Sequence, residues 1–403
     1  MQQSKPPPPP LPLLSVAEAQ SRLFALATPV ATKTSPLGEV LGHYTGAPIV
    51  AKRYQPAADL SAMDGYAIRF DDLPGPWVVV GESAAGHPFT GTCARGEAVR
   101  IFTGASLPTG SDTIVIQEDV GRTGDQIALT GNGPAERGRH VRYKGMDFAA
   151  GKTLISAGAI MTPARIALAA AAGLSHITVG RKVRIALVAT GDELVPVGAP
   201  VIGTQLPESN SLMLAAMIAD LPVEIIDLGI LPDQLNTLVS AFAAVDADIL
   251  VTTGGASVGD HDLVRPALTA AGATINFWRI AMRPGKPMMA GILGKAVVLG
   301  LPGNPVSAFV TARLFLRPLV AALSGANEPL PKTLTATLGA ALPANDQRQD
   351  YLRAHIIDGR VEAASVQDSS MLLTLAQSDC LIIRPPHAPP AQIGDSVPIL
   401  PLT

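Results

Sequence analysis

Two carboxylates stand side by side directly after a predicted strand, in the segment Thr190–Leu194, which reads TGDEL. In a parallel sheet, the loops at the carboxyl ends of the strands form the ligand crevice. Adjacent carboxylates in such a crevice can hold a hydrated divalent cation that bridges phosphate oxygens. We therefore predict a metal site at Asp192 and Glu193, with a simple polar Gly-Asp turn as the alternative.

A glycine-rich segment, TGGASVGDHD over residues 253–262, follows another predicted strand and precedes a helix. Glycines let backbone amides approach an anion closely, and the helix N-terminus adds to the attraction. Asp260 and Asp262 are further candidate metal ligands, and His261 is expected at the surface or behind the site. The segment matches neither the GxxxxGK[ST] loop of nucleotide hydrolases nor the GxGxxG fingerprint. A tight turn is the alternative.

Three cations lie close together in sequence, at Arg279, Arg283 and Lys286, and the segment GLPGNP follows at residues 300–305. Proline turns hold these cations near a predicted helix N-terminus. That arrangement suits a multiply charged oxyanion or a phosphate. A solvated charge cluster explains the same residues equally well.

Other polar residues are weak candidates when taken alone. Asp64 stands in MDGYA and Thr103 in FTGA, and Asp-Gly is above all a turn signal. Asp147 and Asp233 are isolated acids, and Asp233 is most simply a helix cap after Pro232.

The elements that must position these residues are clearest between about 181 and 325, where short β-branched runs alternate with helical patterns. This alternation predicts a parallel sheet covered on both faces. The expected strands are 183–189, 223–228, 249–253 and 296–299. One expected helix begins at Ser209 or Asn210 and carries Leu212, Ala215, Ala216 and Ala219, and another is capped by Asn304 with Pro305 at its first position.

The rest of the chain divides by composition. Residues 51–139 have Gly or Pro every few positions, which predicts an inserted β-rich domain with strands at 77–80 and 113–117. The segments 14–50 and 140–180 are mixed and are expected to form one linking domain. Residues 181–327 form the α/β domain, and 328–403 a small C-terminal β domain with strands at 353–357 and 381–384. The run Pro6–Pro10 predicts an extended leader over residues 1–13.

The composition excludes several classes of protein. The chain has 403 residues, of which 47% are hydrophobic and 16% charged, a balance typical of a globular protein. A net charge of -3 argues against nucleic acid as the main ligand. Cys93 and Cys380 are too few and too far apart for a metal cluster or a disulfide framework, although one long-range disulfide stays open. The sequence predicts neither a secretory signal nor a membrane span, so we expect a cytoplasmic protein.

Taken together and in order, the strings SAMDGYA, AVRIFTGASLPTGSD, TGDEL, SNS, TTGGASVGDHD, MRPGKP and GLPGNPVSAF resemble the molybdopterin molybdenumtransferase (MoeA) family, which includes the E domain of gephyrin. The resemblance extends over about residues 14–385. It implies a four-part α/β subunit: a linking domain in two segments, a β domain inserted between them, a three-layer α/β domain with a mostly parallel sheet, and a C-terminal β domain.

The resemblance also implies a reaction. Family members insert molybdate into adenylylated molybdopterin with Mg²⁺ and release AMP, which completes the molybdenum cofactor. They are homodimers, with the active cleft between the α/β domain of one subunit and the β insertion of the other. The molybdopterin adenylyltransferase and apo-molybdoenzymes are the further partners implied.

The resemblance assigns roles to individual residues of the motifs. The resemblance implies catalytic roles for Asp64, Thr103, Glu193 and Asp262, and metal binding by Asp192, Glu193, Asp260 and Asp262. It implies substrate binding by Asp147, Asp233, Ser257, Arg279, Arg283, Lys286, Pro302, Asn304, Pro305, Arg353 and Ser370. Positions 279 and 283 are lysine in some members, and arginine keeps the charge while binding oxyanions in a planar, bidentate way. The usual Asp-Asn pair upstream of SAMDGYA reads Asp59-Leu60 here.

Two other functions remain open at this point. A smaller adenylyltransferase would share TGDEL and GGASVGD, although the inserted and C-terminal domains argue against it. A non-catalytic scaffold role of the gephyrin E type would share the whole fold.

Overall fold

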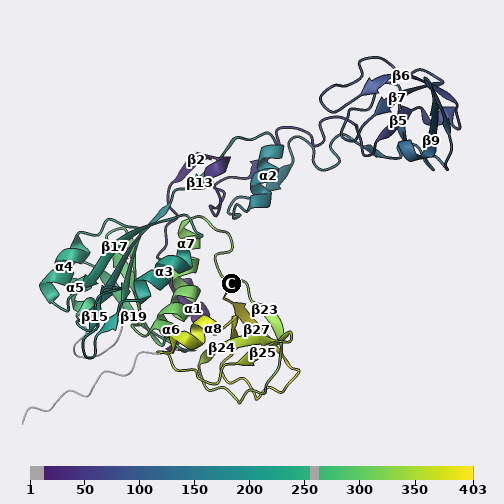
Figure 1. Cartoon of the computed structure of the whole chain (residues 1–403). Helices are drawn as coiled ribbons and strands as arrows, with labels where there is room; N and C mark the ends of the chain where they lie inside the picture. The colour runs from purple at the N-terminus through teal and green to yellow at the C-terminus, as the bar shows by residue number, and fades with distance from the viewer. Residues whose placement is uncertain (1–12, 255–262, 403) are drawn as a thin grey trace, which may run out of the picture.

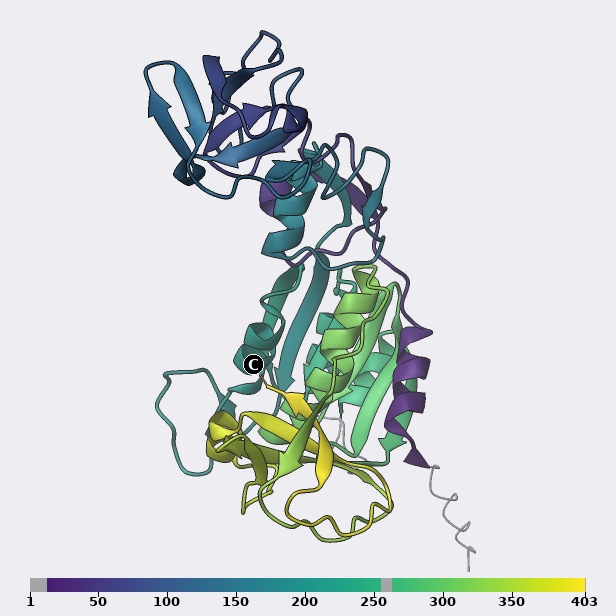
Figure 2. The same ribbon diagram turned by 90° about the vertical axis from the view of Figure 1, so that its right-hand side faces the viewer.

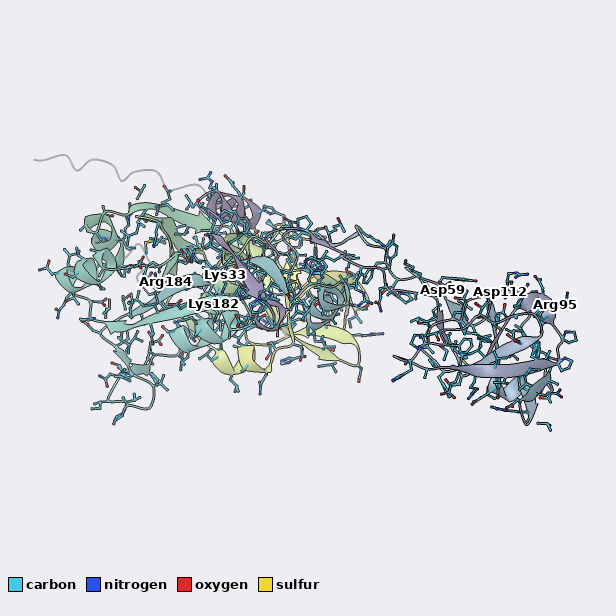
Figure 3. All side chains as sticks on the ribbon, turned by 90° about the horizontal axis from the view of Figure 1, so that it is seen from above. Lys33, Asp59, Arg95, Asp112, Lys182 and Arg184 are labelled. Atoms are coloured by element: carbon cyan, nitrogen blue, oxygen red, sulfur yellow. The ribbon has the colours of Figure 1, made fainter. Side chains whose placement is uncertain are left out.

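The computed structural model of the protein describes residues 13–254 and 263–402. The chain is elongated (Figure 1): a β-rich unit occupies one end, a slender mixed region lies in the middle, and the α/β sheet and the C-terminal strands fill the other end. The view at 90° agrees (Figure 2). Seen from above, Asp59, Asp112 and Arg95 lie on the β-rich unit, far from Lys33, Lys182 and Arg184 (Figure 3).

A seven-stranded sheet forms the core of the α/β region. Its order is β1-β19-β21-β22-β18-β14-β17, and only β21 runs antiparallel to its two neighbours. The bounds are Leu13–Leu14 for β1, Thr274–Ile280 for β19, Pro287–Leu293 for β21, Ala296–Leu301 for β22, Ile249–Thr253 for β18, Val183–Thr190 for β14 and Val223–Leu231 for β17. All four predicted strands of this region are confirmed.

Helices cover both faces of this sheet. Along β14, Ile185 and Leu187 belong to one apolar cluster and Ala186 and Val188 to the other, because successive side chains point to opposite faces. The helices α1 (Val16–Phe24), α3 (Asn210–Ile218), α6 (Pro305–Thr311) and α7 (Arg317–Leu323) contribute to the first cluster, and α4 (Leu235–Ala243) and α5 (Val264–Ala270) to the second. The predicted three-layer arrangement is therefore confirmed.

The N-terminal residues pack differently from the expectation. The sequence assigns them to the linking segment from residue 14, but β1 pairs in parallel with β19 and α1 packs on the same sheet. The reason is the apolar stripe of α1, where Val16, Ala19 and Leu23 are buried. The other domain limits remain a prediction.

Two helix starts also differ in detail from the sequence prediction. The buried face of α3 is Leu214 and Ile218, whereas Leu212 is 59% exposed. The start of α3 is capped from Glu208, whose Oε1 accepts a hydrogen bond from the amide of Ser211 at 2.9 Å, and neither Ser209 nor Asn210 provides a side-chain cap. Asn304 precedes α6 as predicted, but its side chain makes no capping hydrogen bond.

The β-rich unit contains a six-stranded sheet in the order β8-β5-β7-β6-β10-β9. Trp77 and Ile127 are among its most buried side chains, and Cys93 is a buried free thiol. The bounds are Thr113–Ile116 for β8, Gly65–Ile68 for β5, Glu97–Ile101 for β7, Trp77–Ser83 for β6, Gln126–Leu129 for β10 and Val120–Thr123 for β9. Both predicted strands of this unit are confirmed.

Three short antiparallel pairs connect this unit to the rest of the chain. They are β2 (Thr32–Pro36) with β13 (His176–Gly180), β3 (Ile49–Val50) with β12 (Thr153–Ile155), and β4 (Leu60–Ser61) with β11 (Val141–Arg142). The helix α2 (Pro163–Ala171) packs beside them. Segments before and after the insertion therefore pair with each other.

The C-terminal strands close on themselves into a small barrel, because β24 pairs with both β25 and β26. The strand β20 (Met282–Arg283) adds to β24 from the α/β region. The bounds are Leu334–Leu338 for β23, Gln349–Ile357 for β24, Arg360–Ala363 for β25, Leu372–Gln377 for the helix α8, Cys380–Arg384 for β26 and Ser396–Pro401 for β27. The predicted strands are confirmed, and Cys380 is a buried free thiol.

One helical run, Pro305–Leu323, is long and apolar enough to cross a membrane by length and composition. Within its most apolar window, 78% of the residues are buried inside the protein. This burial is typical of a core helix, so the run is weak evidence for a membrane span.

Candidate active site

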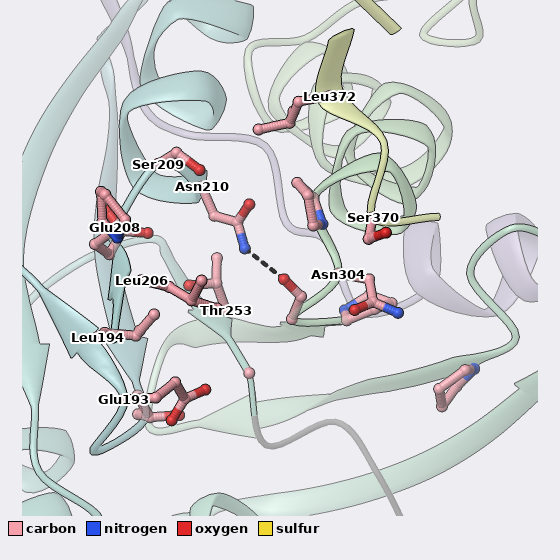
Figure 4. A pocket seen from close by; sticks show the side chains of 17 residues that line it. Glu193, Leu194, Leu206, Glu208, Ser209, Asn210, Thr253, Asn304, Ser370 and Leu372 are labelled. Atoms are coloured by element: carbon pink, nitrogen blue, oxygen red, sulfur yellow. Dashed lines mark hydrogen bonds between the residues drawn. The ribbon is translucent and has the colours of Figure 1, made fainter. Parts of the chain in front are cut away.

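A cavity of about 770 Å³ opens at the carboxyl ends of β14 and β18, where ligands bind in open α/β sheets. It brings together five residues that the sequence analysis assigned to a site: Glu193, Pro302, Asn304, Pro305 and Ser370. Ser370 comes from the C-terminal barrel, so two parts of the chain contribute walls. The other lining residues are Thr190, Leu194, Leu206, Pro207, Glu208, Ser209, Asn210, Thr253, Gly254, Pro287, Gly303 and Leu372, most of which Figure 4 shows.

Glu193 belongs to an acidic group with Asp192 and Asp233. The Oδ1 atom of Asp192 accepts a hydrogen bond from the backbone amide of Asp233 at 3.1 Å. Burial, and then the negative charges of Asp192 and Glu193, raise the pKa of the Asp233 carboxyl. Asp233 is therefore a third member of this group, and it is not the cap of α4, whose preceding residue is Gln234.

The acidic group can be tested against the chemistry of Mg²⁺. Within residues 13–254 and 263–402, no three His, Cys, Asp or Glu side chains are grouped to hold a metal ion. Mg²⁺, however, commonly takes only one or two carboxylates and completes its shell with water and substrate phosphates. Asp192 and Glu193, which form no ion pair with any residue that the structure describes, fit that pattern. The remaining predicted residues, Ser257, Asp260 and Asp262, lie outside the described residues.

The three predicted cations divide into two kinds. Arg283 is committed to Asp350 of the barrel, with Nε and Nη2 donating to the two carboxylate oxygens at 2.7 Å each. Arg279 and Lys286 lie at the loop end of the β19–β21 hairpin, where Arg279 pairs with Pro287 and the amide of Ile280 donates to the carbonyl of Lys286 at 2.9 Å. Neither forms an ion pair within the described part of the chain. They are the cations available to an anion, while Arg283 joins the α/β sheet to the barrel.

Arg353 is buried and supports the loop that carries Ser370, and it is not open to a ligand. Its side chain is 1% exposed, and Nη1 donates to the backbone carbonyl of Asp368 at 2.8 Å. Asp368 in turn accepts hydrogen bonds from the amide and hydroxyl of Ser370, at 2.8 and 2.6 Å. The expected oxyanion contact of Arg353 conflicts with this burial, because the arginine lies behind the loop that carries Ser370.

Asp64 and Thr103 form a compact pair in the β-rich unit. Thr103 donates to Oδ1 of Asp64 through its amide at 2.7 Å and through its hydroxyl at 2.8 Å. These two hydrogen bonds hold the pKa of Asp64 below its usual value. Asp64 directly precedes β5 and Thr103 follows β7, and these strands lie at the opposite end of the structure from α3 and α6, whose first residues line the cavity (Figure 1). Within one chain, the structure does not bring Asp64 and Thr103 to Glu193.

Asp147 lies in a different place again. It lines a cavity of about 430 Å³ with Gln55, Pro56, Leu60, Arg142 and Met146, at the root of the β-rich unit. Its amide donates to the carbonyl of Gln55 at 3.0 Å. Among the described residues of one chain, the structure thus separates Asp147 from the acidic group at Asp192.

The sequence analysis missed one carboxylate of the main cavity. Glu208 directly precedes the SNS segment, and it is 8% exposed. A carboxylate just ahead of a predicted helix start is the signal that could have identified it. The sequence analysis considered Asn210 only as a cap, yet its Nδ2 donates to the carbonyl of Gly303 at 2.8 Å across the cavity wall.

Comparisons with known proteins agree with the order of the motifs. Residues 14–173 match the MoeA N-terminal region (domain I and II), residues 186–322 a probable molybdopterin binding domain, and residues 335–402 the MoeA C-terminal region (domain IV). The molybdopterin molybdenumtransferase of Haemophilus influenzae is 34% identical over 96% of this chain and 98% of its own length. That of a Nostoc species is 33% identical over 94% and 92%.

A solved structure supports the same relationship. The molybdopterin biosynthesis MoeA protein of Pyrococcus horikoshii OT3 superposes with a TM-score of 0.83 and 25% sequence identity, covering 97% of this chain and 100% of that one. Its match spans the α/β region, the β-rich unit and the barrel together. On the identity and coverage of these relatives, the chain belongs to the molybdopterin molybdenumtransferase (MoeA) family of transferases.

Proposed function

We propose that this protein catalyses the Mg²⁺-dependent insertion of molybdate into adenylylated molybdopterin, with release of AMP, as the last step of molybdenum cofactor synthesis in the cytoplasm. The observation that carries the proposal is the cavity at the carboxyl ends of β14 and β18. It combines an acidic rim at Glu193 with apolar walls, and it is large enough for a heterocyclic ligand.

The charges around the cavity support separate tasks. Asp192 and Glu193 would hold Mg²⁺, which when bound neutralises the charge of the pyrophosphate bridge. Arg279 and Lys286 would hold molybdate or a phosphate, because neither is neutralised by an ion pair in the described chain. Proline turns at Pro302 and Pro305 keep the loop ahead of α6 rigid beside the bound ligand.

The pair of Asp64 and Thr103 would act on the cavity of a second copy. The two hydrogen bonds from Thr103 lower the pKa of Asp64 below its ordinary value and so favour its ionised form. An ionised carboxylate can orient the attacking species or accept its proton at the free Oδ2 atom. Since β5 and β7, which position the pair, lie at the other end of the structure from α3 and α6 beside the cavity (Figure 1), we propose a homodimer with each active site shared between subunits.

The first experiment measures AMP release from purified adenylylated molybdopterin, with and without molybdate and Mg²⁺. Formation of active cofactor is followed by reconstitution of an apo-molybdoenzyme. We expect release that depends on both additions and yields working cofactor. Tight substrate binding without release would contradict the transferase activity, and ATP-dependent formation of the adenylylated compound would instead identify an adenylyltransferase.

A mixing experiment tests the shared site. Asp64→Asn and Glu193→Gln variants are each expected to be inactive, and they are mixed under conditions that exchange subunits. If each site combines Asp64 of one copy with Glu193 of the other, mixing restores about one quarter of the wild-type activity, because half of the dimers then hold one intact site of two. No recovery after demonstrated exchange would contradict the shared site.

A further inference from the structure

One wall of the main cavity offers hydrogen-bond acceptors that have no counter-ion. Glu208 is nine-tenths buried, and only one hydrogen bond to its carboxylate is present in the described chain, from the amide of Ser211 to Oε1. Glu208 forms no ion pair with a described residue. The neighbouring Asn210 spends its Nδ2 on the carbonyl of Gly303, while its Oδ1 is buried without a hydrogen-bond partner. Figure 4 shows both side chains on the wall formed by the start of α3.

The chemistry of this wall excludes an anionic ligand group. None of the described cavity-lining residues is a lysine or arginine, so a phosphate placed against Glu208 would meet an uncompensated negative charge. The carboxylate of Glu208 instead requires donors from the ligand, because an unsatisfied buried acceptor costs free energy that a matching N–H group recovers. Oδ1 of Asn210 is enclosed by protein atoms and is not offered to the ligand. The best occupant is therefore a neutral group that presents several N–H donors.

Three leucines also line the cavity near Glu208. Leu194 and Leu206 lie below Glu208, and Leu372 comes from the opposite side on the C-terminal barrel (Figure 4). Aliphatic side chains on two sides favour a flat ring over a flexible polar group, because the ring buries two faces at once. The subsite thus combines an apolar slot with an acceptor edge.

We propose that Glu208, on the cavity wall that Asn210 ties to Gly303, binds the amino-pyrimidinone edge of the pterin, and that this contact selects the pterin end of the substrate over its adenine end. The inference rests on the proposed function for the identity of the substrate. A pterin presents its exocyclic amine and the adjacent ring N–H side by side, and a carboxylate accepts both at once. Adenine presents an amine beside a ring acceptor, which would face the carboxylate unfavourably.

The variant Glu208→Gln separates recognition from folding. A glutamine keeps Oε1 as an acceptor for the Ser211 amide, so the start of α3 remains capped. It removes the charge and replaces the second acceptor by a donor, which opposes the N–H groups of the pterin. The matched control is Glu39→Gln, an exposed carboxylate in the linking region, far from the cavity.

Calorimetric titration of the full-length protein with 6-hydroxymethylpterin and, separately, with AMP tests the subsite. We expect Glu208→Gln to weaken pterin binding at least about tenfold, as for a site that loses a required hydrogen bond. AMP binding should change less than about twofold, and Glu39→Gln should match the wild type for both ligands. Pterin affinity that is unchanged in Glu208→Gln, pterin affinity undetectable in the wild type, or equal loss for both ligands would overturn the inference.

These outcomes are distinct from a failure of the proposed function, because pterin binding requires no chemistry. Wild-type protein that releases AMP in a molybdate-dependent way, while Glu208→Gln keeps full pterin affinity, would contradict only the subsite. Binding of the pterin that depends on Glu208, in a protein that never releases AMP, would contradict only the catalytic proposal.

Discussion

Asp64 and Thr103 are joined twice through a single carboxylate oxygen, since the amide and the hydroxyl of Thr103 both donate to Oδ1 of Asp64. The other oxygen, Oδ2, accepts no hydrogen bond from the described residues. The carboxylate is thereby fixed in orientation while one oxygen stays free for a ligand. In the proposed reaction, this free oxygen is the one that would contact the substrate.

Removing the hydroxyl should therefore reduce activity without unfolding the protein. We expect Thr103→Val to lower the rate of AMP release about tenfold and Asp64→Asn to lower it about 10²- to 10⁴-fold, the range typical of a lost general base. Thr103→Ser keeps the hydroxyl and should retain most of the activity. Steady-state rates on the dimeric protein provide the measurement, and full activity of Asp64→Asn would show that this carboxylate is not catalytic.

Asp233 should make the stability depend on pH. Burial and the charges of Asp192 and Glu193 raise its pKa above 3.8 in the folded protein, so ionisation of Asp233 opposes folding. The contribution of Asp233 to the free energy of unfolding is therefore fully present below pH 3.8, and it is lost as the pH rises through the raised pKa of the folded protein. We expect Asp233→Asn to match the wild type in unfolding free energy at low pH and to be more stable at neutral pH.

Urea unfolding between pH 3.5 and 7 provides the comparison for Asp233. The control is Asp125→Asn, because the carboxylate of Asp125 is 80% exposed in the β-rich unit. This variant should not gain stability over the wild type as the pH rises. Added Mg²⁺ should reduce the advantage of Asp233→Asn, because a bound cation would compensate the acidic group. An advantage that is constant across the pH range would contradict the assigned cause.

The ion pair of Arg283 and Asp350 should stabilise the junction of the α/β sheet and the barrel. The Asp350 carboxylate is 12% exposed and receives two hydrogen bonds from the guanidinium. We expect Asp350→Asn to lower the unfolding free energy by roughly 1–3 kcal/mol, the usual value of a hydrogen bond to a charged group. Chemical denaturation measures this loss.

Asp346 offers a matched control for that prediction. It also lies near Arg283, with a 3.4 Å contact to Nη1, but its side chain is 44% exposed. Asp346→Asn should therefore have a much smaller effect, since solvent screens exposed pairs. Equal losses for the two variants would show that the bidentate geometry contributes nothing special.

Arg353 should act on the loop that carries Ser370. Arg353→Met removes the donor to the Asp368 carbonyl and leaves buried acceptors unpaired, at a cost of about 1–3 kcal/mol each. We expect faster amide hydrogen exchange over residues 367–371 and a higher KM for substrate. Normal exchange with a selective loss of molybdate-dependent AMP release would instead indicate direct contact between Arg353 and the substrate.

Glycine at position 65 should be required for the position of Asp64. A Cβ atom there would collide with the carbonyl oxygen of Val115 on the neighbouring strand β8. Gly65→Ala is expected to destabilise the β-rich unit, which a thermal unfolding scan would detect as a transition at a lower temperature than in the wild type. The same variant is expected to lose AMP release. Gly38→Ala, where nothing lies within 4 Å of the added atom, is the control and should unfold like the wild type.

Much of the α/β region was predictable because its strands are buried on both faces. The run Ile249–Thr253 is apolar or β-branched throughout and is a strand with the bounds expected. The face of α3 was not predictable in the same way. Its sequence is apolar almost all round, so Leu212 and Leu214 look alike, and only packing against α6 and β14 buries Leu214.

The sequence motifs identified most candidate site residues, but they did not predict where these residues lie in the fold or which groups they contact. Arg283 and Arg353 read as free cations in the sequence, because their acceptors, Asp350 and the carbonyl of Asp368, come from elsewhere in the chain or from a backbone position. Glu208 stands just ahead of a predicted helix start, and that position alone does not show its burial in the cavity wall. Partners distant in sequence decide the two arginines, and burial in the folded protein decides Glu208.

The pairing of β4 with β11 affects how the coding segment of the β-rich unit can be exchanged during evolution. Leu60 pairs with Arg142 and Ser61 with Val141, so the chain enters and leaves the β-rich unit at neighbouring points. The entropic cost of bringing these ends together rises only slowly with the length of the segment between them. A recombination event that exchanges the intervening coding segment preserves the register on both sides, so this unit can be acquired, replaced or diversified independently of the α/β core.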